Sequence, residues 1–519
     1  MPDTTARFKT QLPRNSFFQL LAFGTQVGIG IWLVPYLIRH LGTAAYGLIP
    51  VAGILTEYVS LISHSISTAV NRFLTIALQR DDLDEANRIF STAFYSYLAI
   101  GLLQVPFFVL VIWYADSLIT IPTELYKDAV VLLACSATVF LVNLVSGIFG
   151  VPIYANNRLD ISRSIDIGRY LFRLAGIVIF FLTFGPALRY VGYVELTMSL
   201  VIFVAQVVIA RRLAPTLRLG WHHYDWRKIK QLVGMGGWLL VNSIGTLLFL
   251  RIDVWVCNRF VGAESAGEYA AVLQWATLIR HGGIILSTLI APMVMIYYAR
   301  SQNGQLLRLC KLSVRVLSLC ITVPIGIMCV SSPALLTIWL GEAFTGLAPL
   351  LILLVCHLAI NVGVMPLFNI QVAMNKVRIP ALVTFVMGVV NLVLAVSFVR
   401  YFHWGIYGVA IAGAIVLTTK NALFTPIYSA IILREPWHAF ASSYLSALGL
   451  LVGLTASGYL LTRYMVPTSG FHLVLFSLGM GVTGLAGAWF LLPQPDRQEL
   501  VSLIPGRFGT VAARLMPSD

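Results

Sequence analysis

The chain has 519 residues, of which 58% are hydrophobic and 11% are charged, and its 35 basic and 21 acidic residues give a net charge of +14. So few charged residues cannot cover the water-facing surface of a soluble protein of this length, and this composition excludes a soluble globular chain. The basic residues lie in loops between apolar stretches rather than on one soluble face. We therefore relate the positive charge to membrane orientation and lipid headgroups, and expect no nucleic-acid partner.

Apolar stretches of about 20 residues or more recur along the whole chain, which is what the hydrocarbon core of a membrane requires of a spanning α-helix. Strands of a membrane β-barrel are only about 10 residues of strict alternation, and these stretches do not show that pattern. The first stretch lacks a cleavage site and is interpreted as a mature helix. The sequence therefore predicts an all-α polytopic membrane protein of about fourteen spans. They lie at residues 16–38, 46–70, 90–114, 128–154, 165–186, 190–211, 236–258, 266–291, 310–331, 346–374, 380–402, 406–433, 441–464 and 471–493.

The loops between these spans carry their basic residues unevenly. With a cytoplasmic N-terminus, 25 of the 35 basic residues fall in inside segments or at the adjoining ends of spans, 6 fall likewise on the outside and 4 lie deeper within spans. Short cytoplasmic loops of membrane proteins carry an excess of lysine and arginine. We therefore predict a multi-pass protein of a bacterial inner membrane, with both termini in the cytoplasm.

Two stretches of the chain align with each other without a gap at a shift of 220 residues. Chance matching of two apolar, glycine-rich stretches is the alternative to duplication. Each copy contains six spans, an even number, so two duplicated bundles would be related by an axis along the membrane normal. We predict six-helix lobes at residues 1–220 and 221–437, followed at 438–519 by an extra helix pair and a cytoplasmic tail. The aligned pairs include Arg39 with Arg259, Gly42 with Gly262 and Gly47 with Gly267.

Three passages carry a family resemblance. The stretch 17–48, which ends VPYLIRHLGTAAYGL, and the stretch LRIDVWVCNRFVGAESAGEYAAV at 250–272 resemble helices of the polysaccharide transporter family, the Wzx-type flippases of the MATE-like MOP superfamily. The passage 373–416, which begins AMNKVRIPALV, looks like the tenth to twelfth helices of that family. The chain departs from the lipid II flippase branch because its first predicted span contains no arginine. Peptidoglycan precursor is therefore a less favoured cargo.

The resemblance implies a V-shaped pair of six-helix lobes that work by alternating access through a cationic cavity. The implied cargo is an undecaprenyl-pyrophosphate-linked oligosaccharide repeat unit, moved from the cytoplasmic to the periplasmic leaflet for surface or exopolysaccharide assembly. Membrane lipids are implied partners, and a polysaccharide polymerase and a chain-length regulator are candidate partners. Relatives often carry two extra C-terminal helices, which correspond here to about residues 441–493.

Six ionisable residues stand out within the predicted spans, where a charge costs about 2.5–3.5 kcal/mol at a helix centre and persists mainly beside a cavity or a partner. Arginine can hold a pyrophosphate through a bidentate fork and lysine as a point charge. The alternative is that the arginines nearer the membrane surface extend to the headgroups, or that opposite charges pair structurally. We predict that the four cations bind substrate. The six are Arg280, Lys420, Arg251, Arg173, Asp253 and Glu57.

The two carboxylates of this set, Asp253 and Glu57, are candidates to bind a coupling proton or sodium ion, and a structural ion pair is the alternative. Asp253 is two residues from Arg251, a spacing that places them on different helix faces. Each of the two therefore needs another partner.

We expect neither a metal nor a cofactor, and no enzymatic activity. The six cysteines fall in or beside apolar segments without a C-x-x-C pair, as buried small hydrophobic residues do. Asp82 and Asp84 form a D-x-D motif, but their loop is too short for a nucleotide-sugar domain, and no P-loop is present.

Two other functions stay open. A multidrug or cation antiporter of the same superfamily would carry a cationic amphiphile and should have an acidic cavity, whereas basic residues predominate here. A non-transporting membrane subunit of a polysaccharide synthase is the third possibility.

Overall fold

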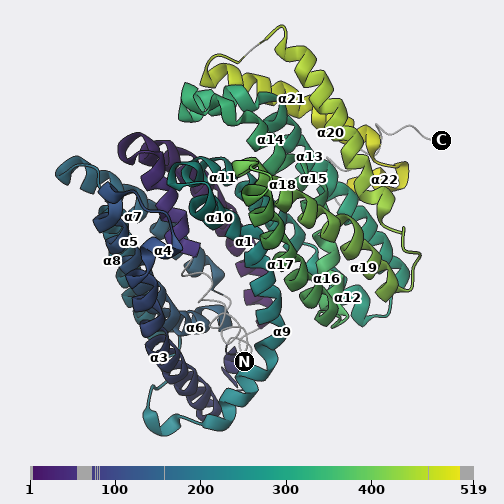
Figure 1. Ribbon diagram of the computed structural model, residues 1–519. Helices are drawn as coiled ribbons and strands as arrows, with labels where there is room; N and C mark the ends of the chain where they lie inside the picture. Colours follow the sequence, from purple (N-terminus) through teal and green to yellow (C-terminus); the bar gives the residue numbers. More distant parts are fainter. Residues whose placement is uncertain are drawn as a thin grey trace. The chain divides into compact units, whose positions relative to one another are not determined.

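The computed structural model describes residues 4–54, 70, 73–75, 77–78, 80, 82–156, 158–465 and 467–502. Within these residues all regular structure is helical and no β-strand occurs (Figure 1). Twelve described helices are long and apolar enough to cross a membrane. Two shorter apolar helices, Thr43–Ile54 and Val241–Leu250, coincide with the second and seventh predicted spans. The prediction of an all-α polytopic membrane protein is therefore confirmed.

The chain forms two compact units. Unit 1 comprises Met1–Ala271 and Thr384–Val409, and unit 2 comprises Val272–Val383 and Ala410–Asp519. Helix α11 (Ala263–Thr288) contributes residues to both. The two units are defined by contacts between residues in the structure, which do not test duplication. The division into duplicated lobes at residue 220 therefore stays a prediction.

Unit 1 is built from long helices that pack in pairs, α5 on α8, α1 on α7, and α3 on α5. Buried residues of α3 and α5, including Phe90, Tyr97, Phe140 and Leu144, belong to one core cluster. The described helices of unit 1 are α1 (Thr4–Leu41), Thr43–Ile54, α3 (Leu83–Trp113), α4 (Ala115–Leu118), η1 (Thr123–Leu125), α5 (Tyr126–Ser146), η2 (Gly147–Gly150), α6 (Val151–Ala155), α7 (Leu159–Phe184), α8 (Leu188–Leu213), η3 (Trp221–His223), α9 (Trp226–Leu250), α10 (Ile252–Phe260), the start of α11, most of α17 (Arg378–Arg400) and the start of α18 (Gly405–Thr418).

The D-x-D motif begins a helix. The carboxylate of Asp82 accepts a hydrogen bond of 3.0 Å from the backbone N–H of Glu85 and so caps α3. Asp84 pairs with Arg88 one turn further on, at 3.0 Å. Acidic residues at a helix N-terminus satisfy free N–H groups and complement the helix dipole, so both carboxylates have a structural explanation.

Glycines allow two helices of unit 1 to touch through their backbones. A Cβ atom on Gly267 of α11 would lie 2.0 Å from the carbonyl oxygen of Thr43, and one on Gly47 would lie 2.6 Å from the backbone nitrogen of Gly267. Only glycine fits so close an approach. Gly47 and Gly267 are aligned with each other by the 220-residue shift. Two residues that the sequence predicts to be equivalent therefore lie in direct contact.

Unit 2 is organised around α13 (Asn303–Leu340), which packs against α14, α15, α20 and α21. In Figure 1 the C-terminal pair α20 and α21 lies along α13. Leu319 and Val323 of α13 share a core with Leu450, Leu454 and Met480 of that pair. The other helices of unit 2 are α12 (Ala291–Ala299), η4 (Glu342–Leu347), α14 (Ala348–Cys356), α15 (Leu358–Gly363), α16 (Pro366–Ala373), the π-helical turn Thr419–Phe424, α19 (Thr425–Leu433), α20 (Ala441–Thr462), α21 (Gly470–Leu491) and α22 (Gln494–Ser502).

Helix α22 is tied to unit 2 by ion pairs at its polar face. Arg308 pairs with Glu499 at 2.7 Å, and Arg315 pairs with Asp496. These contacts hold the end of the described chain against the beginning and middle of α13.

The seventh predicted span is broken rather than continuous. Helix α9 ends at Leu250, and Arg251, with φ −127° and ψ −31°, separates it from α10. The amide of Asn391 on α17 donates a hydrogen bond of 3.0 Å to the carbonyl oxygen of Leu248. A carbonyl freed by the break therefore has a side-chain partner, which lowers the free-energy penalty of interrupting the helix.

Candidate functional site

Three polar residues of unit 2, His357, Asn361 and Thr418, form a chain of contacts near Arg280 and Lys420, and we call these five residues the unit 2 polar network. Arg280 on α11 interacts electrostatically with the ring of His357, which lies between α14 and α15. The amide nitrogen of Asn361 lies 2.6 Å from Nδ1 of His357 and donates to the hydroxyl of Thr418 at 3.1 Å. Thr418 directly precedes the π-helical turn that carries Lys420. The structure thus brings two predicted cations to one polar region.

The side chain of Lys420 is 9% exposed, and its ammonium lies 5.2 Å from the centre of the Phe368 ring. A cation over an aromatic face is stabilised by the ring quadrupole, which partly offsets the cost of burial. The lysine lies in a π-helical turn, an irregularity that is frequent at functional sites.

The irregular turn has a local cause. Pro426 has no backbone N–H, so it cannot donate to the carbonyl of Ala422 one turn before it. The hydroxyl of Tyr444 on α20 donates to that carbonyl instead, at 2.8 Å. The extra C-terminal helix pair therefore supports the segment that positions Lys420.

Within unit 2, no acidic residue lies in the middle of a span. In the sequence its acidic residues are Glu342, Glu435, Asp496, Glu499 and Asp519. Glu342 begins η4, and Glu435 follows the end of α19. Asp496 and Glu499 lie on α22, where they form ion pairs with arginines of α13. The mid-span region of unit 2 therefore carries the positive charges of Arg280 and Lys420 without a mid-span carboxylate.

The other two predicted cations lie in unit 1. Arg173 on α7 pairs with Glu195 on α8, with 2.8 Å between Nε and Oε1. Glu195 was not among the predicted site residues, although an acidic residue within a predicted span can be recognised from the sequence. Arg251 lies at the break between α9 and α10, where it has electrostatic or polar contacts of its own.

Asp253 is buried in unit 1 and hydrogen-bonded to two neighbouring helices. Its carboxylate accepts from the hydroxyl of Tyr269 at 3.1 Å and from the amide of Asn391 at 3.3 Å. These contacts join α10, α11 and α17, as expected of a structural carboxylate as well as of an ion site. The other coupling candidate, Glu57, lies outside the described residues.

Comparison with known proteins gives a consistent picture. A family model described as polysaccharide biosynthesis protein matches residues 12–297. The uncharacterised membrane protein EpsK of Bacillus subtilis (strain 168) is 31% identical over 439 residues, which cover 84% of this chain and 87% of that protein. A putative O-antigen transporter of Shigella flexneri is 24% identical over 271 residues, which cover 50% of this chain and 60% of that protein. The predicted family resemblance is confirmed.

Solved structures share the fold. The lipid II flippase MurJ, in an inward closed conformation, matches with a TM-score of 0.65 at 13% identity and covers 91% of this chain and 98% of its own. An inward-facing multidrug resistance MATE family transporter of the MOP superfamily matches with a TM-score of 0.57 at 17% identity, over 84% of this chain and 95% of its own. At these identities the likeness concerns the fold alone.

Proposed function

Since the chain belongs to the polysaccharide biosynthesis protein family, we propose that it is a flippase for undecaprenyl-pyrophosphate-linked oligosaccharide repeat units. It moves them from the cytoplasmic to the periplasmic leaflet for surface or exopolysaccharide assembly. The predicted lobes at 1–220 and 221–437 alternate access to the two sides. A polysaccharide polymerase and a chain-length regulator are its proposed partners.

The observation that carries this proposal is the charge of the unit 2 polar network. A pyrophosphate needs positive charge and directed donors to enter a region of low dielectric constant. Arg280 supplies a guanidinium fork and Lys420 an ammonium, and the sequence of unit 2 contains no acidic residue in the middle of a span. We propose these two residues as the principal headgroup contacts. Arg251 is a further candidate, whereas the ion pair with Glu195 makes Arg173 the weakest of the four.

The decisive experiment is a flipping assay in proteoliposomes with a defined undecaprenyl-pyrophosphate-linked saccharide. The wild-type chain should accelerate transfer over empty liposomes, Arg280→Ala should remove most of that acceleration, and Arg280→Lys should retain part of it, because charge remains but the fork is lost. Arg300→Ala is the matched control, since Arg300 is an exposed arginine at the end of α12. No acceleration by well-folded wild-type protein would reject the flippase.

The proposed location is a bacterial inner membrane, with both termini in the cytoplasm, because the loop charges are asymmetric. Reporter fusions test this orientation. Fusions after Gly220, Gly304 and Arg497 should report cytoplasm, and fusions after Gly42, Gly262 and Thr468 should report periplasm. A cytoplasmic signal after Gly42 and Gly262 would reject this orientation.

A multidrug or cation antiporter is the second candidate, and one observation favours it. Asp253 is a buried carboxylate that hydrogen bonds to Tyr269 and Asn391, and such a carboxylate can exchange a proton for a cation. Asp253→Asn keeps the shape and removes the charge. It should abolish export of organic cations if the chain is an antiporter, whereas flipping of the anionic headgroup at Arg280 and Lys420 would persist in the flippase.

A further inference from the structure

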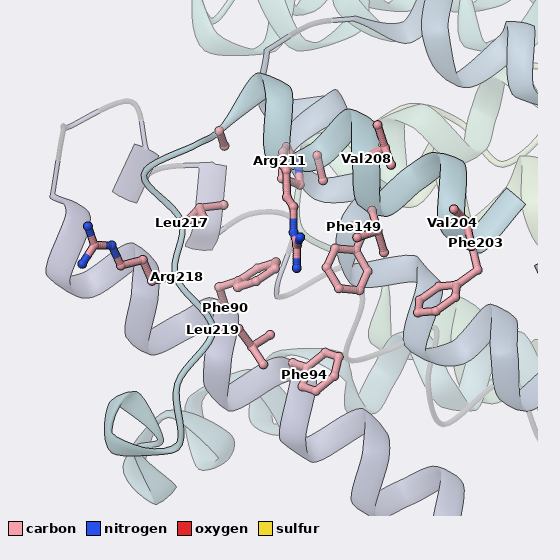
Figure 2. Close-up of a pocket in the computed structure, with 14 residues that line it drawn as sticks. Phe90, Phe94, Phe149, Phe203, Val204, Val208, Arg211, Leu217, Arg218 and Leu219 are labelled. Atoms are coloured by element: carbon pink, nitrogen blue, oxygen red, sulfur yellow. The ribbon is translucent and has the colours of Figure 1, made fainter.

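Unit 1 contains an apolar pocket of about 680 Å³ that none of the candidate site residues lines. Its walls come from α3, η2, α8 and the loop that follows α8, and four phenylalanines face it (Figure 2). The volume falls in the range of about 300–1,000 Å³ that is usual for small-ligand sites. We call it the α8 pocket; its four phenylalanines are Phe90, Phe94, Phe149 and Phe203.

One cation enters this apolar space. Figure 2 shows the guanidinium of Arg211 between Phe90 and Phe149, whereas the side chain of Arg218 points away. Among the described residues no carboxylate forms an ion pair with Arg211, in contrast to Arg158, Arg163 and other arginines of unit 1. Arg211 can therefore offer its full donor set to an anion.

The pocket is preformed rather than dependent on a mobile loop. The backbone N–H of Arg218 donates to the side chain of Asn87 at 2.7 Å, and the buried hydroxyl of Ser91 accepts from the N–H of Gly220 at 3.3 Å. On the opposite wall Phe149 makes edge-on contacts with three other phenylalanines, with ring centres 5.8–6.1 Å apart. A ligand can enter without paying for the ordering of its walls.

The pocket lies at the end of a helix that is long and apolar enough to span a membrane. Helix α8 ends at Leu213, with Arg211 and Arg212 in its last turn, while Val208 one turn earlier and Val204 two turns earlier are exposed. A ligand that fits both parts has a hydrocarbon chain and an anionic headgroup. On the predicted topology this boundary is the cytoplasmic one.

We propose that the α8 pocket binds one anionic phospholipid of the adjoining leaflet, with an acyl chain against the phenylalanines and the phosphate at Arg211. Positive charge predominates in this part of the chain, because Arg218 also belongs to the pocket wall and the carboxylate of Glu85 on α3 is paired with Lys228 at 2.5 Å. The size of the pocket suits one lipid chain rather than a long polyprenyl tail. This inference does not depend on the proposed transport activity.

The site also has a structural consequence, because one wall is the segment that leads from α8 to α9. Ala214, Leu217, Arg218 and Leu219 of this segment line the pocket, and Asp225 is anchored to α3 through a hydrogen bond of 3.0 Å from its N–H to Thr92. A bound lipid would therefore hold the connection between the two predicted lobes in its described position. Lipid should protect this segment from hydrogen exchange.

Three variants of the full chain test the site. Arg211→Gln removes the charge inside the pocket, and Val208→Trp fills the space for the chain while it keeps that charge. Arg212→Gln is the matched control, since Arg212 is the next residue, is exposed and does not line the pocket. Unchanged thermal unfolding without added lipid verifies that each variant is folded.

The measurement is native mass spectrometry of purified protein titrated with phosphatidylglycerol, phosphatidylethanolamine or a polyprenyl phosphate. Wild type should bind one phosphatidylglycerol in preference to the others, and inorganic phosphate should not displace it. Arg211→Gln and Val208→Trp should each weaken binding by about tenfold or more, as loss of a charged hydrogen bond or of the chain site implies, while Arg212→Gln stays within about twofold.

Several results would overturn the proposal. Equal weakening by Arg211→Gln and Arg212→Gln would show general surface attraction, and full binding by Val208→Trp would show that no chain enters the pocket. A preference for polyprenyl phosphate would assign the pocket to a different lipid. Displacement by inorganic phosphate would show that only the anion is recognised.

Discussion

Replacing Lys420 by methionine should abolish transport without loss of stability. An uncompensated charge in a membrane-spanning helix costs about 2.5–3.5 kcal/mol. The Phe368 ring, 5.2 Å from the ammonium, returns about 0.5–2 kcal/mol of that. The lysine makes further polar or electrostatic contacts, which reduce the gain from its removal. We therefore expect the methionine variant to be at least as stable as the wild type.

A purely structural role for Lys420 predicts instead that the methionine variant is less stable than the wild type, because the group that interacts with the lysine would be left buried without it. Thermal unfolding in detergent and export in cells, at matched membrane abundance, separate the two. Lys376→Met is the matched control, since Lys376 is exposed in the loop before α17, and it should leave export unchanged. Two results together would refute our reasoning: destabilisation of Lys420→Met by more than about 1 kcal/mol, and normal export per molecule of inserted protein.

Two further substitutions test packing contacts, one beside Lys420 in unit 2 and one between helices of unit 1. Tyr444→Phe should leave the Ala422 carbonyl without its hydroxyl donor and destabilise the protein by about 1–3 kcal/mol. Transport should fall while the amount of properly inserted chain stays the same. An unchanged unfolding midpoint would show that another donor replaces the hydroxyl. Gly267→Ala would place a methyl group 2.0 Å from the Thr43 carbonyl oxygen and should lower stability by about 1–3 kcal/mol. Gly449→Ala is the control, since Gly449 has open space around it, and it should be neutral or slightly stabilising. Equal unfolding midpoints for the two alanine variants would show that the close contact is unimportant.

The sequence predicted the spans well because hydrophobic length is a local property. Each of the fourteen predicted stretches corresponds to a long apolar helix or, at the second and seventh positions, to a shorter one. The break at Arg251 escaped prediction because its cause is distant. Asn391, which bonds the Leu248 carbonyl, lies 138 residues beyond Asp253, with which it also bonds.

The candidate site was only partly accessible to sequence reasoning. The cost of buried charge drew attention to Arg280 and Lys420, but charge alone could not identify the neutral residues His357 and Asn361 that lie near them. A neutral amide or imidazole in a span costs little and resembles core packing in the sequence. Contacts between helices, not residue type, decide which of these side chains forms part of a network.

The contact between Gly47 and Gly267 bears on how such a chain arose. If one ancestral bundle was copied, a residue that touches its own counterpart marks a place where two identical chains would have met before fusion. A single glycine in that ancestor would have served both sides of the contact at once. After fusion two separate codons must preserve it, and a change in either alone is enough to force the backbones apart.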